Sequence, residues 1–276
     1  LVNTPTRYNS ELTKGLAAEL AKNLDCQLLT VPIGDFIDET ADALEGLPLP
    51  DDTVHLTGFM KENMQARDRS SRILAALSAS FGGIFTCNAN KTETTVGYGT
   101  LYGDLAGAFA ATADLWKYQI YDLGRKLNAW YGRAVIPEGI FTVMPSAELS
   151  ENQDVTQGKG DPLIYEYHDY LFRSFIEPWQ RQTPEDILKA YAKGNLEDLI
   201  GCSIIVSNIF PTAKDFIEDL EKWWNLFSGF AVAKRIQTPP LLAVSRRPYG
   251  YDLRESQLRP YYTDAYLSLK EKLLAD

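Results

Sequence analysis

The order of apolar segments predicts an α/β fold in which parallel strands are flanked by helices. Residues 27–33 (QLLTVPI) and 83–88 (GIFTCN) are short apolar runs typical of buried strands. Segments with helical periodicity precede and separate these runs, which is the order of a parallel α/β sheet. After about residue 163 the expected elements are all helices. We therefore expect an α/β core over residues 1–163 and a helical region over 164–276 that packs on the same domain.

The individual elements follow from periodicity and capping residues. Residues 1–8 are expected to be the end of a strand that runs into a loop. A helix follows from residue 9 or 10, because Leu12, Leu16 and Leu20 lie four positions apart. Further helices are expected over about residues 35–45, 59–80, 114–128 and 212–235. Another helix is expected to begin after the capping residue Thr183. Two clear strands are too few for a closed sheet, and we expect material upstream.

Composition excludes several classes of protein. The 276 residues carry 27 Lys and Arg against 37 Asp and Glu, a net charge of -10. This acidic balance argues against nucleic acid or an anionic membrane as the main partner. No apolar run is long enough to span a membrane. Three distant cysteines and only two histidines fit free thiols in a cytoplasmic protein and make a Cys- or His-based metal site implausible.

Residues 86–107 (TCNANKTETTVGYGTLYGDLAG) follow the second expected strand, at the edge of an α/β sheet where ligands bind. Four glycines in this segment indicate sharp turns or backbone close to a ligand. Its acids are Glu93 and Asp104, and carboxylate oxygens such as those of Glu93 suit Mg²⁺. The alternative, which composition alone favours, is a glycine-rich loop with solvated acids.

Lys117 is expected in the first turn of the helix that Asp114 would cap. A cation at this positive end of the helix dipole is unfavourable unless an anion such as phosphate binds there. The alternative is a solvated lysine that pairs with Asp114. On the earlier helix 59–80, Asn63 and Arg67 share one face, which allows a ligand role, although such an arginine is usually solvated.

Residues 143–163 form a long polar segment without periodicity, as lids and binding loops do. Ser146, Thr156 and Lys159 in this segment can donate hydrogen bonds to phosphate. A plain mobile loop is an equally good interpretation.

Together these segments resemble the ordered motifs of the NAD⁺ synthetase family. The match covers about residues 5–170 and 228–250. The motifs are NMQARDR at 63–69, ANKTE at 89–93, GYGTLYGD at 97–104, LWK at 115–117, PSAEL at 145–149, and a Lys234-Arg235 pair before Pro239-Pro240. The resemblance implies an adenine-nucleotide alpha-hydrolase-like (ATP-pyrophosphatase) sheet. It also implies a ligase that uses ATP and Mg²⁺ to adenylate deamido-NAD⁺, after which ammonia gives NAD⁺, AMP and pyrophosphate.

The resemblance also implies roles for individual residues, with Glu93 as a Mg²⁺ ligand. Asp104 would lie near the reacting carboxylate and hold or deprotonate ammonium, and Lys117 would act on the phosphates as a second catalytic group. The ATP-binding residues would be Arg7, Lys117, Ser146 and Lys234. The residues that bind deamido-NAD⁺ would be Asn63, Arg67, Tyr98 and Asp104.

The sequence departs from the family pattern in four places. The pyrophosphate loop Ser-Gly-Gly-x-Asp-Ser is absent, so we expect a fragment truncated at its N-terminal edge and inactive alone. Asn88-Ala89 replaces Thr-Gly, Ala233 replaces a histidine, and no acidic cluster follows Ser146. The long helical region resembles that of glutamine-dependent members, which implies an upstream glutaminase domain, and the family implies a homodimer or higher homo-oligomer. The alternatives are another ATP-pyrophosphatase that forms amides and a non-catalytic fragment that binds a dinucleotide.

Overall fold

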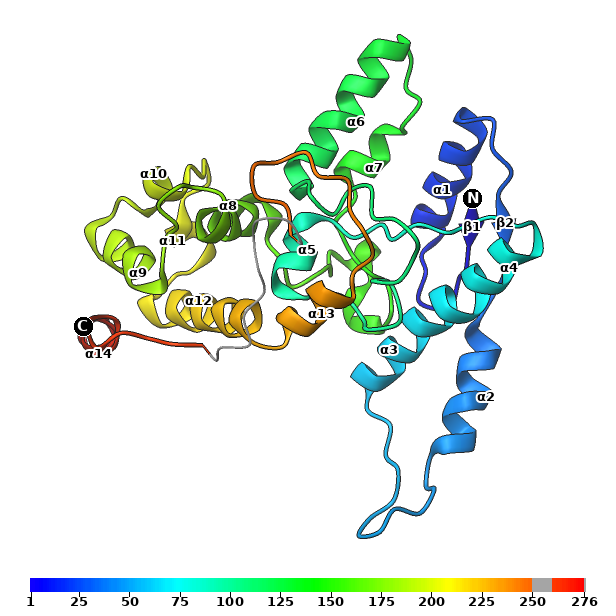
Figure 1. The fold of residues 1–276 in the computed structure, drawn as a ribbon, viewed down its shortest axis with the longest axis horizontal. Coiled ribbons are helices and arrows are strands. Elements are labelled where there is room, and N and C mark those ends of the chain that lie inside the picture. Colours follow the sequence, from blue (N-terminus) through cyan, green and yellow to red (C-terminus); the bar gives the residue numbers. More distant parts are fainter. Residues whose placement is uncertain (250–259, 276) are drawn as a thin grey trace. The chain divides into compact units, whose positions relative to one another are not determined.

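The computed structural model describes residues 1–249 and 260–275, which divide into two compact units (Figure 1). Each unit combines segments that are distant in the sequence. Unit 1 comprises Leu1–Thr86, Thr100–Ala108 and Gln119–Pro162, and unit 2 comprises the described residues of Cys87–Gly99, Phe109–Tyr118 and Leu163–Asp276. Among the described residues, every helix is too short or too polar to cross a bilayer.

Unit 1 contains the two-stranded parallel sheet. Strands β1 (Val2–Asn3) and β2 (Leu29–Thr30) pair with Val2 opposite Leu29. Helix α1 (Glu11–Asn23) connects them, and its first turn is capped by Ser10, whose hydroxyl accepts from the Thr13 amide at 3.2 Å. The expected helix and the parallel pairing of the strands are therefore confirmed, although the strands are shorter than the apolar pattern indicated.

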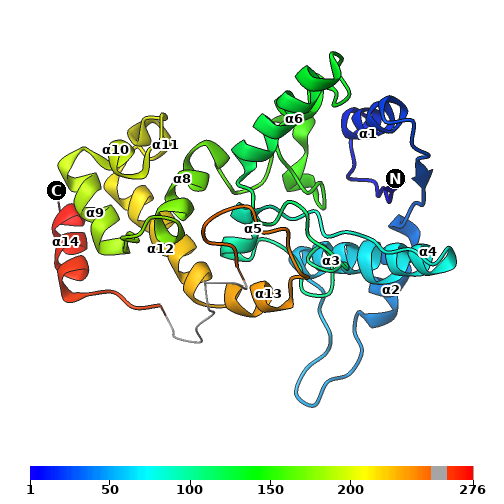
Figure 2. The ribbon, with the colours of Figure 1, turned by 45° about the horizontal axis from the view of Figure 1, so that its top comes forward.

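The remaining helices of unit 1 follow the expected order. The region 59–80 is helical throughout but contains a π-helical stretch, η1, in its middle. Figure 2 shows α3, η1 and α4 as one continuous rod. The elements are α2 (Gly34–Leu44), α3 (Gly58–Arg67), η1 (Asp68–Leu74), α4 (Ala75–Ser80), α6 (Lys117–Tyr131, whose first two residues belong to unit 2), α7 (Glu138–Thr142), and the 3₁₀ turns η2 (Glu151–Gln153) and η3 (Val155–Gln157).

The strand expected over residues 83–88 is wrong. Ile84 is 69% exposed, and the backbone hydrogen bonds of the segment within unit 1 are those of a loop. The Gly83 amide donates to the Ser78 carbonyl at 2.8 Å, and the Ala108 amide donates to the Phe85 carbonyl at 3.0 Å. The segment has β-branched and aromatic residues, but such residues form strands only where neighbouring strands supply a surface to pack on. Among the described residues the sheet consists of β1 and β2 alone.

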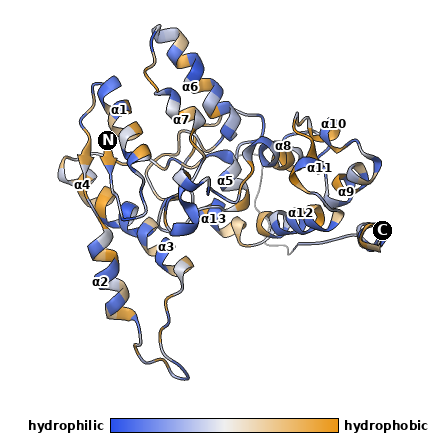
Figure 3. Cartoon of the chain, turned by 180° about the vertical axis from the view of Figure 1, so that it is seen from behind, coloured by the Kyte–Doolittle hydropathy of each residue, from blue (hydrophilic) through white to orange (hydrophobic). Residues whose placement is uncertain are grey.

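Unit 2 is helical around a single apolar core. Its centre holds fully buried aromatic residues, including Tyr167, Phe172, Phe216 and Trp223. Figure 3 shows hydrophobic and hydrophilic residues alternating along α12, as in an amphipathic helix. The helices are α5 (Lys91–Val96), α8 (Tyr165–Ile176), α9 (Pro184–Lys193), α10 (Leu196–Ile200), α11 (Val206–Ile209), α12 (Ala213–Ser228), α13 (Ala231–Gln237) and α14 (Asp264–Ala275).

Capping residues in unit 2 confirm some expectations and correct others. Thr183 caps α9 in a reciprocal capping box with Asp186, as expected. The helix expected over 212–235 is interrupted at Gly229, where α12 ends and α13 follows. Asp114 does not cap α6, because its buried carboxylate accepts from Lys91 and α6 begins only at Lys117. Cys26, Cys87 and Cys202 are in the thiol form and not in disulfides, as expected.

Candidate active site

Thr100 joins two of the predicted site residues in unit 1. Its hydroxyl donates to Asn63 Oδ1 at 2.8 Å, and its backbone amide donates to Asp104 Oδ1 at 2.6 Å. Thr100 itself is buried. The Asn63 amide nitrogen donates to the Phe59 carbonyl at 2.7 Å, within α3. Asn63 therefore holds the 100–104 turn on α3, a role that its motif did not reveal.

The 100–104 turn is fixed at further points. Arg67 Nε donates to the Leu101 carbonyl at 3.1 Å, and the Ser71 hydroxyl donates to the Tyr102 carbonyl. A Cβ atom at Gly103 would lie 3.0 Å from the Thr100 Cβ and 3.1 Å from the backbone of Ala66, so a larger residue there would press the turn against α3. We call Asn63, Arg67, Thr100 and Asp104 the Thr100 cluster.

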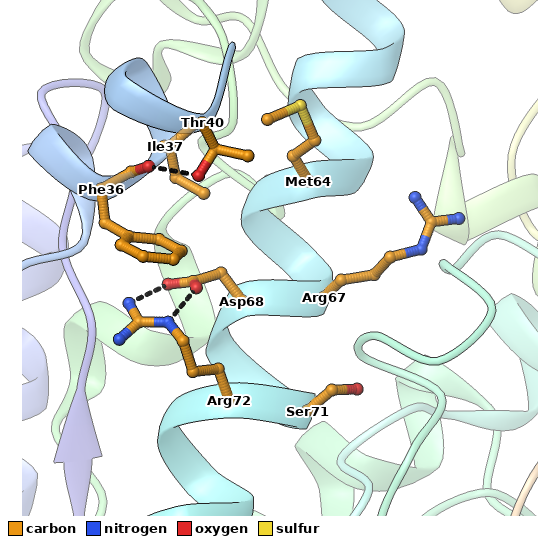
Figure 4. A pocket seen from close by; sticks show the side chains of 8 residues that line it. All are labelled: Phe36, Ile37, Thr40, Met64, Arg67, Asp68, Ser71 and Arg72. Carbon is orange, nitrogen blue, oxygen red and sulfur yellow. Dashed lines mark hydrogen bonds and ion pairs between the residues drawn. The ribbon is translucent and has the colours of Figure 1, made fainter. Parts of the chain in front are cut away.

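A surface pocket lies beside Arg67, between α2 and the α3–η1 helix (Figure 4). On one side, the Arg72 guanidinium lies 3.9 Å from the centre of the Phe36 ring and donates to Asp68 Oδ2 at 2.8 Å. Figure 4 shows Arg67 pointing away from this pair. Arg67 therefore keeps its charge apart from the Asp68 carboxylate. The pocket is lined by Phe36, Ile37, Thr40, Met64, Arg67, Asp68, Ser71 and Arg72.

In unit 2, Glu93 and Lys117 both contact Tyr165. The Glu93 carboxylate closes a capping box, accepting from the Asn90 amide at 2.9 Å and from Asn90 Nδ2 at 2.6 Å. The Tyr165 hydroxyl donates to Glu93 Oε1 at 3.3 Å. Lys117 Nζ lies 5.1 Å from the centre of the Tyr165 ring, at cation–π distance. Tyr165 thus brings together two residues that the sequence placed in one site.

Asp169 of α8 contacts the start of α6, and the sequence motifs gave no indication of this role. Its Oδ2 accepts from the Tyr118 amide at 2.9 Å, and its Oδ1 accepts from the Thr92 hydroxyl of α5. Burial raises the pKa of Asp169 to about 6, although Thr92, the Tyr118 amide and Lys117 act in the opposite direction. The first turn of α6 therefore receives an anion from the protein itself.

Lys234 and Arg235 satisfy the C-terminal end of α5. Lys234 Nζ donates to the Gly97 carbonyl at 2.7 Å, and Arg235 donates to the Thr95 carbonyl. Gly97 has φ +67°, and a Cβ there would lie 2.9 Å from Ala231. Tyr98 follows directly, and its amide donates to the Glu93 carbonyl at 2.8 Å. Cations near the last carbonyls of a helix stabilise it, which explains this pair structurally.

Arg7 and Ser146 lie in unit 1 with partners of their own. Arg7 forms an exposed ion pair with Asp38 at 2.7 Å. The Ser146 hydroxyl donates to the Gln153 carbonyl at 2.7 Å and accepts from the Glu148 amide at 3.2 Å, so it orders the loop that contains it. That loop is joined to α1 because Glu148 Oε2 accepts from the Thr13 hydroxyl at 2.6 Å.

A magnesium site is not complete in these side chains. Among residues 1–249 and 260–275, no group of three or more His, Cys, Asp or Glu side chains could hold a metal ion. Both Glu93 oxygens already accept hydrogen bonds from Asn90. The described residues therefore do not fit a metal site by themselves.

Comparison with known proteins identifies the family. The model of the NAD synthase family matches residues 2–200. A glutamine-dependent NAD(+) synthetase of Thermotoga maritima is 39% identical over 186 residues, which cover 66% of this chain and 30% of that protein. One of Xanthomonas campestris is 33% identical over 254 residues, covering 92% of this chain and 40% of that protein. The chain thus spans about a third of the length of these curated relatives.

Solved structures agree on the fold. A glutamine-dependent NAD(+) synthetase from Cytophaga hutchinsonii superposes with a TM-score of 0.67 at 18% identity, covering 99% of this chain and 40% of that one. The NMN synthetase of Francisella tularensis gives a TM-score of 0.52 at 21% identity, covering 88% and 76%. At these identities the likeness concerns the fold, an α/β arrangement of helices and a small parallel sheet. From the family match over residues 2–200, the chain belongs to the NAD synthase family.

Proposed function

We propose that the chain is the synthetase part of an enzyme that amidates deamido-NAD⁺ to NAD⁺ with ATP. The observation that carries the proposal is the family match over residues 2–200, supported by curated relatives that are named glutamine-dependent NAD(+) synthetases. The nicotinate carboxylate attacks the α-phosphate of ATP, and pyrophosphate leaves. Ammonia then attacks the acyl-adenylate, AMP leaves with the C–O electron pair, and a proton is lost from nitrogen.

The Thr100 cluster supplies the acceptor side of this proposal. Asp104 Oδ1 accepts a hydrogen bond from the Thr100 amide, which holds the carboxylate in one orientation. In this orientation the carboxylate can take a proton from ammonium. Arg67 is an exposed cation beside the pocket of Figure 4 and suits a phosphate of the dinucleotide. Asn63 and Tyr98 complete the proposed contacts to deamido-NAD⁺.

The ATP side of the proposal depends on cations. Lys117 begins α6, where it would neutralise charge that develops on the phosphates. Arg7, Ser146 and Lys234 are the further proposed ATP contacts. The adenine-nucleotide alpha-hydrolase-like sheet and Mg²⁺ are proposed from the sequence resemblance only. Glu93 would be one Mg²⁺ ligand, and water and substrate phosphate would have to supply the others.

The surroundings of the reaction are also proposals. The names of the curated relatives favour glutamine as the ammonia source, through a glutaminase domain elsewhere in the full-length protein. A homodimer or higher homo-oligomer and a cytoplasmic location are proposed from the resemblance and the free thiols.

Calorimetric titration of deamido-NAD⁺ into the full-length protein, with NAD⁺ as the control ligand, tests the acceptor side. We expect saturable binding that weakens at least tenfold in Arg67→Ala. Arg125→Ala, an exposed arginine of α6 that pairs with Asp122 at 3.6 Å, is the matched control and should bind normally.

A pyrophosphate-release assay with ammonia and ATP tests the reaction itself. Release that requires deamido-NAD⁺ and yields NAD⁺ and AMP in equal amounts supports the proposal. Release with a different carboxylate acceptor, such as nicotinate mononucleotide, would indicate another ATP-pyrophosphatase. Tight dinucleotide binding without AMP formation would indicate a binding protein that has lost catalysis.

A further inference from the structure

One face of α8 contacts the helices that carry Glu93 and Lys117. Tyr165, Asp169 and Arg173 lie four positions apart and so share this face. Tyr165 contacts both Glu93 and Lys117, as described above. Arg173 donates to the Tyr118 hydroxyl at 3.0 Å. We call these three residues the α8 face.

Within the α8 face, Asp169 accepts hydrogen bonds from both a side chain and a backbone amide. Each of its carboxylate oxygens serves a different helix. Oδ1 accepts from Thr92, the residue before Glu93 in α5, and Oδ2 accepts from the amide of Tyr118, the residue after Lys117 in α6. A shift of the carboxylate would therefore move Lys117 relative to Glu93.

We propose that Asp169 is a positioning residue of the synthetase, which sets the place of Lys117 by binding the first turn of α6 to α5. This inference rests on the proposed function, since Lys117 is there the phosphate contact. Asp169 is 0% exposed, so it acts through Lys117 and does not touch the substrates.

The chemistry of the site favours positioning over simple structural support. A buried carboxylate is costly, and a neutral side chain could join two helices without that cost. The charged groups that face it are Lys117 from α6 and Glu166 from its own helix, while Thr92 of α5 offers a neutral hydroxyl. A charge retained in such surroundings places an anion at the dipole of α6 and near the Lys117 ammonium, which restricts where both can lie.

Four variants of the full-length protein test the proposal. Asp169→Ala removes both hydrogen bonds. Asp169→Asn can keep both, with its amide oxygen facing Tyr118 and its amide nitrogen facing Thr92, but removes the charge. Thr92→Val removes the bond to α5 only. Glu271→Ala, which removes an exposed acid of α14, is the matched control.

The readouts are hydrogen exchange of the peptide that contains the Tyr118 amide and the kinetics with ATP varied. Asp169→Ala should speed exchange at Tyr118 at least tenfold and lower kcat/KM for ATP by tenfold or more. Asp169→Asn should keep the protection of Tyr118 yet still lower kcat/KM. Thr92→Val should lie between wild type and Asp169→Ala, and Glu271→Ala should match wild type.

A double variant separates positioning from general destabilisation. In a Lys117→Ala background, Asp169→Ala should lower kcat/KM by less than threefold further, because the group that it positions is already gone. Multiplicative losses would overturn the proposal, as would unchanged exchange at Tyr118 in a folded Asp169→Ala protein. Absence of NAD⁺ formation by wild type would refute the proposed function instead. In that case the exchange at Tyr118 and ATP binding by calorimetry still decide whether Asp169 holds α6.

Discussion

Lys91 Nζ lies 2.9 Å from Asp114 Oδ1, and neither side chain is exposed to solvent. The same ammonium group donates to Ser245 Oγ at 2.9 Å. Asp114 Oδ2 accepts from the backbone amides of Val244 and Ser245 at 2.7 and 2.6 Å. This buried pair therefore fixes α5 to a segment about 150 residues later in the chain.

Replacing Lys91 by Met should destabilise the protein by about 3–5 kcal/mol, because it leaves the Asp114 carboxylate buried without its counter-charge. Urea denaturation measures this change. Lys91→Met with Asp114→Asn should recover part of the loss. The control Lys189→Met breaks an exposed pair with Glu185 and should leave the midpoint unchanged within error. Equal losses of unfolding free energy in Lys91→Met and Lys189→Met would contradict the burial of the Lys91–Asp114 pair.

Gly97→Ala should cost about 2–4 kcal/mol, since it combines a left-handed backbone with a Cβ that would lie 2.9 Å from Ala231. Gly194→Ala is the matched control, because Gly194 ends α9 at φ +70° with open space around it. It should cost only about 1 kcal/mol. Thermal unfolding of the two variants isolates the contact with α13. A similar loss in both would mean that α13 does not press on Gly97.

Thr100→Val should weaken acceptor binding while costing only about 1 kcal/mol of stability, because the lost hydroxyl leaves Asn63 Oδ1 without that donor. The backbone bond from residue 100 to Asp104 remains. We expect KM for deamido-NAD⁺ to rise several-fold with the KM for ATP unchanged. Thr142→Val, on the exposed side of α7, should behave as wild type. Equal changes in both KM values would place Thr100 outside the acceptor side.

Asp169→Asn should be more stable than wild type at pH 7.5. The pKa of Asp169 is raised from 3.8 to about 6 in the folded protein, so the folded state binds the proton more tightly. Protonation of Asp169 therefore stabilises the folded state. This stabilisation is complete below about pH 3.8 and is lost as the pH rises through about 6. The resulting advantage of the variant is about 3 kcal/mol at neutral pH.

The same reasoning makes the advantage of Asp169→Asn depend on pH. It should shrink as the pH falls from 6 to 4, which urea denaturation at several pH values would show. A variant that is less stable than wild type at every pH would mean that the ionised carboxylate contributes net stability through its two hydrogen bonds.

Local sequence signals predicted the fold where the local interactions decide the structure. Thr183 and Thr212 start their helices as expected, because capping needs only the next three residues. The failures occur where distant residues compete. Asp114 is a good capping residue by type, but Lys91 binds it instead, and a pairing across 23 positions leaves no local pattern.

In the candidate site, too, local motifs were visible in the sequence, whereas contacts between distant residues were not. Motifs predicted Asn63, Asp104 and Lys117 as candidate site residues, but they did not show which side chains hold these residues in place. Thr100 reaches Asn63 across 37 positions, and Asp169 reaches Thr92 across 77. The four-residue spacing of Tyr165, Asp169 and Arg173 was visible in the sequence. Only the hydrogen bonds that α8 makes to α5 and to the first turn of α6 give that spacing a meaning.

The contacts that Lys234 and Arg235 make to the end of α5 have a consequence for biosynthesis. α5 has six residues, too short to persist alone, and its final carbonyls are satisfied by side chains about 140 residues later. On a translating ribosome, this segment emerges long before the residues that complete it. Unit 2 should therefore acquire its native structure late, after α13 has left the exit tunnel, and its earlier segments depend until then on chaperones or on transient collapse.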